Sequence, residues 1–126
     1  MRRTDQRRAA VVALYQRDVT DRSLGELVPS AATGFTKELA EGVDAHVEEL
    51  DAITERHSVG WTVDRIAPLE RNILRVALFE LLHREDVPAE VAIDEAVEAA
   101  KELCSVDAPG FVNGILGTVQ REEVAR

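Results

Sequence analysis

The sequence predicts an all-α fold, with about six main helices in two packed three-helix bundles. Apolar residues recur at every third or fourth position, and no stretch alternates for long enough to form a strand. Hydrophobic residues make up 45% of the chain but aromatic residues only 4%, so the core must be aliphatic and rich in alanine, as in packed helices. At 126 residues we expect a single domain, 1–126, with subdomains of approximately 1–60 and 61–126 sharing one core.

The segment from Pro68 to Arg84 predicts the helix around which the others pack. Its apolar residues cover most of the helical circumference, which is typical of a helix contacted on two sides. Pro68 suits a first helical position, and Glu70 suits the positive end of the helix dipole. Glu80 falls inside the apolar arc, so we expect it to have a structural partner, and Arg84 follows in the favourable order. The remaining polar strip consists of Arg71, Asn72, Arg75 and His83.

The other expected helices lie on either side of this segment. They are a helix capped by Thr4 or Asp5 and running to about Val19, a short helix within Asp18–Val28, one from Phe35 to about His57, one from Pro88 to Cys104, and one from Phe111 to about Arg121. Ser30–Gly34 is expected to be a loop, and Trp61–Ile66 a connector of about one helical turn.

Charge is distributed unevenly along the chain. The net charge is −9, yet residues 1–17 carry five Arg against one Asp, a balance of +4, so residues 18–126 sum to −13. A basic segment on an acidic body suggests a polyanion site and a separate basic partner. Within residues 85–102, seven acids accompany one Lys. This acidic ridge is either a solvated helix face or a surface that receives a basic protein.

Two groups of residues suggest sites that bind RNA or another anion. Guanidinium groups match phosphate geometry and stack on bases, so an arginine cluster near the N-terminus favours single-stranded RNA; the alternative is a solvated, frayed terminus. The cluster comprises Arg2, Arg3, Arg7 and Arg8. Phe111 follows Pro109–Gly110, so its ring is expected at the mouth of a helix whose N–H groups favour an anion, or else in the core. Asn113 is expected to bond a neighbouring backbone or to face a ligand, and Gly114 to permit close packing.

Catalysis and metal binding have little support in the sequence. The single cysteine, Cys104, excludes an internal disulfide and favours a reducing compartment. The three histidines lack the second Glu-x-x-His motif of a carboxylate-bridged metal site, and no glycine loop for phosphates is present. We therefore expect neither an enzyme nor a cofactor or metal. The chain has no signal-peptide pattern and no apolar span, so we expect a cytoplasmic protein without membrane contact.

Four blocks of the sequence, in order, resemble the NusB family of bacterial transcription antitermination factors. They read RRAAVVALYQ, FTKELAEGV, LERNILRVALFELLHREDVPAEVAIDEAVEAAK and FVNGIL. The resemblance implies two three-helix bundles that bind boxA RNA of ribosomal RNA leaders together with the ribosomal small-subunit protein NusE. Through that pair it implies an indirect role at the elongation complex of RNA polymerase. A homodimer is also expected to be possible, since some members of the family dimerise.

The resemblance also assigns roles to individual residues. It places six residues at the RNA: Arg3, Arg7, Arg8, Tyr15, Asp107 and Phe111. Arg2 and Asn113, which the sequence pattern itself suggests, complete the expected RNA-binding set. Glu70, with Arg71 beside it, falls on the surface offered to NusE. Thr4, Asp5 and Gln6 interrupt the basic motif, and Gly110 stands where some members carry a basic residue, so we expect weaker RNA binding by the isolated protein. The alternative is a non-catalytic interaction module related to the N-terminal domain of ribosomal RNA methyltransferases.

Overall fold

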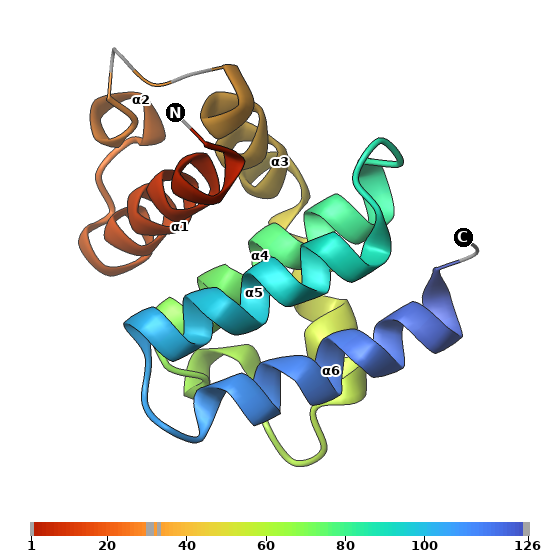
Figure 1. The fold of residues 1–126 in the computed structure, drawn as a ribbon. Coiled ribbons are helices and arrows are strands. Elements are labelled where there is room, and N and C mark those ends of the chain that lie inside the picture. The colour runs from red at the N-terminus through yellow and green to blue at the C-terminus, as the bar shows by residue number, and fades with distance from the viewer. Residues whose placement is uncertain (1, 30–31, 33, 125–126) are drawn as a thin grey trace.

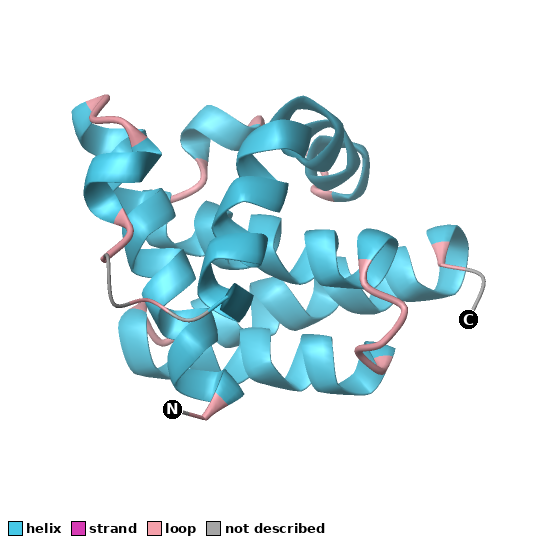
Figure 2. Cartoon of the chain, turned by 90° about the horizontal axis from the view of Figure 1, so that it is seen from above, coloured by secondary structure: helices cyan, strands magenta, loops and turns pink. Residues whose placement is uncertain are grey.

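The computed structural model describes residues 2–29, 32 and 34–124, and within these ranges it is helical and without strands (Figures 1 and 2). The elements are α1 (Arg3–Thr20), α2 (Leu24–Leu27), α3 (Gly34–His57), the 3-10 helix η1 (Val63–Arg65), α4 (Pro68–His83), α5 (Ala89–Leu103) and α6 (Ala108–Glu123). This confirms the predicted all-α fold. The division into two bundles remains a prediction, because the buried apolar residues of the helices form one continuous cluster.

Helix α4 lies at the centre of the fold. It packs against α1, α3, α5 and α6, and Figure 1 shows it running beside α5, with α1 and α6 on opposite sides. Leu74, Leu78 and Leu81 are almost fully buried on it. Each such side chain stabilises the fold by about 1.5–3 kcal/mol. The expectation that this helix is contacted on two sides is therefore confirmed.

Small residues bring the helices together at two places. Helix α5 turns a row of alanines inward, and these short side chains allow close packing against α4 and α6: Ala89, Ala92, Ala96, Ala99 and Ala100. In α3, a Cβ added at Gly42 would lie only 2.1 Å from Cζ of Phe79 on α4. Gly42 is thus required by the packing of α3 on α4.

Helix ends differ from the expectation in three places. Helix α1 begins at Arg3 without a side-chain cap, since the Thr4 hydroxyl donates to Glu95 instead of capping the backbone. It continues to Thr20 and ends at Asp21, which takes a left-handed conformation with φ 58°, so the second helix is only Leu24–Leu27. Of the expected loop Ser30–Gly34, residues 30, 31 and 33 lie outside the described residues.

The start of α6 changes the position of Phe111. The helix begins at Ala108, because Pro109 is tolerated in a first turn, where its missing N–H needs no partner. Phe111 therefore lies one turn inside the helix and is half-buried. The prediction that it starts the helix is wrong.

Candidate nucleic-acid interface

The four N-terminal arginines lie at the start of α1, with Arg2 directly before the helix, but they differ sharply in exposure. The side chains of Arg2 and Arg3 are 79% and 52% exposed, whereas those of Arg8 and Arg7 are 15% and 6% exposed. The guanidinium groups of Arg2 and Arg3 are therefore the two that a phosphate can reach, and Nε of Arg2 also donates to Oδ2 of Asp5 at 3.4 Å.

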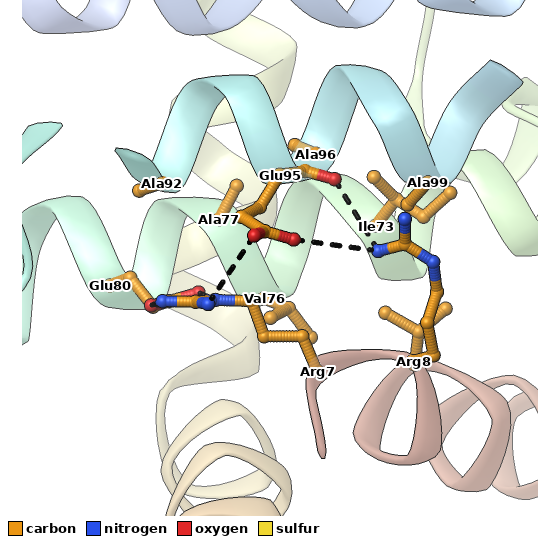
Figure 3. A pocket seen from close by; sticks show the side chains of 11 residues that line it. Arg7, Arg8, Ile73, Val76, Ala77, Glu80, Ala92, Glu95, Ala96 and Ala99 are labelled. Carbon is orange, nitrogen blue, oxygen red and sulfur yellow. Dashed lines mark hydrogen bonds and ion pairs between the residues drawn. The ribbon is translucent and has the colours of Figure 1, made fainter. Parts of the chain in front are cut away.

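Arg7 forms a buried ion pair with Glu80 (Figure 3). Its Nε and Nη2 donate to Oε1 and Oε2 of Glu80 at 2.9 and 2.8 Å, and the Glu80 side chain is 1% exposed. Glu80 thus has the structural partner that its place in the apolar arc demands. That partner is Arg7 and not Arg84, which instead bonds Asp86 and Glu38. A guanidinium committed in this way does not fit the expected RNA contact of Arg7.

Arg8 lies between α1 and the acidic ridge of α5. Its Nε is 3.4 Å from Oε2 of Glu102, and its Nη1 is 3.9 Å from Oε2 of Glu95. A cavity lined by Arg7, Arg8, Glu80 and Glu95 among others is about 10 Å³, enough for about one water molecule and too small for a larger ligand (Figure 3). An RNA phosphate would have to compete with both carboxylates for Arg8.

A second candidate surface is a pocket where the N-terminal ends of α4 and α6 meet. We call it the α4–α6 pocket; its volume is about 390 Å³, and it is lined by Trp61, Arg65, Ile66, Ala67, Glu70, Asp107, Ala108 and Phe111. It brings together two residues expected at RNA, Asp107 and Phe111, and one expected at NusE, Glu70. Phe111 also packs against the hydrophobic core, in agreement with the structural interpretation, and its role in RNA binding remains a prediction.

The α4–α6 pocket has aromatic and charged walls. Trp61 is 52% exposed, and sequence reasoning missed it, although a tryptophan beside Gly60 in a connector was a visible signal. Burial, followed by the negative charge of Asp107, raises the pKa of the Glu70 carboxyl. The lining holds two carboxylates, Glu70 and Asp107, and one cation, Arg65, a balance that suits a ligand with hydrogen-bond donors or a basic side chain.

Asn113 and Tyr15 lie apart from the α4–α6 pocket. Asn113 is exposed and lines a separate groove of about 350 Å³ between α5 and α6, so the structure does not place it beside Phe111. Tyr15 is half-buried on α1, two turns beyond Arg8 and on the same face. Gly114 has open space at its Cβ position, so the expectation that it permits close packing is wrong.

The predicted polar strip of α4 forms an ion-pair network inside the fold. Arg71 donates to Asp18 at 2.6 Å, and Arg75 donates to both oxygens of Asp51 at 2.8 Å. Burial alone would raise the pKa of Asp18, but hydrogen bonds from Arg71 and Asn72 hold it below its usual value. Since this network joins α4 to α1 and α3, the expected role of Arg71 at a partner surface does not fit its position.

Two of the three histidines, His46 and His83, lie together, whereas His57 pairs with Glu122 and Glu123. The rings of His46 and His83 lie 4.3 Å apart, and Nε2 of His83 is 2.7 Å from Glu49. Across residues 2–29, 32 and 34–124, no group of three His, Cys, Asp or Glu side chains could hold a metal ion. The same described residues include no helix that is long and apolar enough to span a membrane.

Comparison with known proteins gives consistent matches along nearly the whole chain. The family model described as the NusB family matches residues 4–121. The transcription antitermination protein NusB of Myxococcus xanthus is 40% identical over 94% of this chain and 93% of its own. A solved structure of T. maritima NusB has a TM-score of 0.86 and 32% identity, covering 97% of this chain and 92% of that one.

A second solved structure contains a partner protein and RNA. It is described as the antitermination factors NusB and NusE in complex with dsRNA, with a TM-score of 0.84 and 28% identity over 94% of this chain and 96% of that one. The match to the family model and the identity to the Myxococcus protein each extend over more than nine-tenths of the chain. The chain therefore belongs to the NusB family.

Proposed function

We propose that this protein is a transcription antitermination factor that binds boxA-type single-stranded RNA of ribosomal RNA leaders together with NusE. In this role it acts in the cytoplasm as a binding factor and not as an enzyme, and it supports processive transcription by RNA polymerase indirectly. The main support for the proposal is the structural similarity, over 94% of the chain, to a NusB solved in complex with NusE and dsRNA.

The charges of the chain support two separate contacts. Arg2 and Arg3 are exposed at the start of α1 on a protein of net charge −9, so RNA phosphates have a local site, while the body as a whole repels them. The same acidic body favours a basic protein partner. The buried state of Arg7 strengthens the expectation that RNA binding by the isolated protein is weak.

RNA binding is tested by fluorescence anisotropy with a labelled single-stranded RNA from a ribosomal RNA leader, at several salt concentrations, with and without NusE. Each phosphate contact to single-stranded RNA contributes a log–log salt slope of about −0.7. Replacing Arg2 and Arg3 by Ala should therefore flatten the slope by about 1.4 units. The matched control replaces two other exposed arginines, Arg22 and Arg121, and should leave the slope unchanged.

The outcomes separate the candidate functions. Absence of RNA binding even in the presence of NusE would contradict the proposal and favour a pure protein-interaction module, to which the acidic ridge of α5 also points. A duplex of the same sequence is included because the related complex contains dsRNA. Tighter binding of the duplex than of the single strand would show that the protein prefers double-stranded RNA. Sedimentation of the free protein checks in parallel whether it forms a homodimer.

The contact with NusE is tested at Glu70. Charge reversal, Glu70→Lys, should lower the rate of association with NusE and leave the helical content unchanged, because interface charges mainly steer association. Glu48→Lys, at an exposed position of α3 outside the acidic ridge, is a control of the same charge change. Equal association rates for the Glu70 variant and the parent would remove Glu70 from the interface.

A further inference from the structure

We propose that Phe35 is a positioning residue for RNA binding, whose ring holds the guanidinium of Arg3 in the orientation in which that group meets a phosphate. The inference rests on the proposed function and deepens it, because it assigns a role to a side chain that touches no RNA. Phe35 is the second residue of α3 and is 7% exposed.

Three guanidinium groups surround the Phe35 ring. The guanidinium carbon of Arg3 lies 4.0 Å from the ring centroid, and those of Arg7 and Arg84 lie 5.2 and 5.3 Å away. Arg7 and Arg84 are also held by carboxylates, the former by Glu80 and the latter by two acids. Of these three cations, only Arg3 is more than half exposed.

The geometry leaves the hydrogen-bonding edge of Arg3 available. A guanidinium that stacks on a ring uses its flat face, whereas its N–H groups lie in the plane and point outward. The carboxylate oxygen Oδ2 of Asp86 is 3.9 Å from Nη1 of Arg3, beyond hydrogen-bond distance. Phe35 thus fixes the position of Arg3 without occupying the atoms that bind a phosphate.

Fixing this side chain in advance should increase affinity. An exposed arginine loses rotational freedom when it binds, which weakens binding by about two- to tenfold for each flexible side chain that must be ordered. Arg3 loses less, since the buried ring of Phe35 already restricts it. Arg2, with a side chain 79% exposed, keeps more freedom and provides the matched comparison.

The test uses the full chain with NusE and the labelled single-stranded leader RNA. Arg3→Lys keeps the charge but loses the planar group, so affinity should fall about two- to tenfold while the salt slope stays unchanged. Arg2→Lys should change affinity by less than about twofold. Phe35→Leu should reproduce the loss seen for Arg3→Lys, again without a change of slope.

A double-mutant comparison distinguishes positioning from a structural effect. Phe35→Leu should lower RNA affinity when Arg3 is present and have no further effect in the Arg3→Ala background. An equal loss in both backgrounds would overturn the inference. So would parental affinity of Arg3→Lys, a surface variant whose result does not depend on how well Phe35→Leu folds. Absence of RNA binding by the parent with NusE would instead remove the proposed function, and the inference with it.

Discussion

Removing the guanidinium of Arg7 should unfold the protein more readily rather than weaken its binding of RNA. The pair joins α1 to α4 through donor distances of 2.8 and 2.9 Å, and the exposed fractions of the two side chains are only 6% and 1%. Breaking a buried pair by removing one partner costs about 3–5 kcal/mol, because the other charge stays buried without compensation. For a protein of this size that corresponds to a fall in Tm on the order of 10–20 °C.

The measurement is urea unfolding followed by circular dichroism for Arg7→Ala, Glu80→Ala and the double variant Arg7→Met/Glu80→Leu. Each single variant should lose about 3–5 kcal/mol, whereas the apolar double variant should regain most of it, since neither charge remains to be buried. Arg17→Ala on the same helix is the control. It breaks a half-exposed pair with Asp44 at 2.8 Å and should cost no more than about 1 kcal/mol.

Measuring RNA binding by the Arg7→Ala variant can contradict this prediction. At a temperature where Arg7→Ala remains folded, its salt slope should equal that of the parent, because a buried guanidinium releases no RNA counterions. A loss of less than about 1 kcal/mol in stability, combined with a slope flattened by about 0.7 units, would show that Arg7 leaves Glu80 to contact phosphate. The reasoning from burial would then be refuted.

Three further predictions concern packing and pH. Gly42→Ala should lower the free energy of unfolding in urea by about 1–3 kcal/mol, because the added Cβ would lie 2.1 Å from the Phe79 ring. Adding Phe79→Leu should recover part of this loss. An unchanged urea midpoint for Gly42→Ala would contradict the prediction. Glu70→Gln should raise Tm at pH 7, since burial and Asp107 raise the pKa of Glu70 and so disfavour its charged form, and the gain should vanish near pH 4. A Tm difference independent of pH would argue against it. Hydrogen bonds from Arg84 lower the pKa of Asp86 to about 2, so the stabilisation by Asp86 is present above pH 3.8 and is lost as pH falls toward 2. The pKa of Asp18 is also lowered, so its stabilisation is likewise lost in acid, and the variant Asp18→Asn should show a smaller acid-induced fall in Tm than the parent.

The sequence was sufficient for the features that depend on local periodicity. The burial of α4 on two sides follows from its apolar residues, and Glu80 was identifiable as paired because a lone carboxylate in an apolar arc is costly. Its partner was not identifiable. Arg84 is near in sequence, whereas Arg7 lies 73 positions away and reaches Glu80 only because α1 crosses α4. Pairing across helices depends on tertiary packing, which periodicity does not encode.

The candidate site shows the same limit. The arginine cluster was visible as a local run of charge, but the sequence treats its members alike, and the structure separates them by their position along the start of α1. Positions 3 and 7 share a face of α1, yet the groove formed with α4 and α5 covers only the second of them. The α4–α6 pocket combines residues from a connector and two helix starts, so no single stretch of sequence could have predicted it.

The basic motif lies on an acidic protein, whose own carboxylates compete with RNA for the arginines. If all four arginines were exposed, the surrounding carboxylates would pair with them loosely and compete with RNA at each position. Instead, Glu80 binds Arg7 in the interior, and Glu95 and Glu102 hold Arg8 against α5, so these charges stabilise the junction of α1 with the core. Arg2 and Arg3 extend beyond that junction, where the α1 backbone is already anchored by the two residues behind them. We therefore expect the interrupted motif to serve two roles, with Arg7 and Arg8 fixing the helix and Arg2 and Arg3 available to the polyanion.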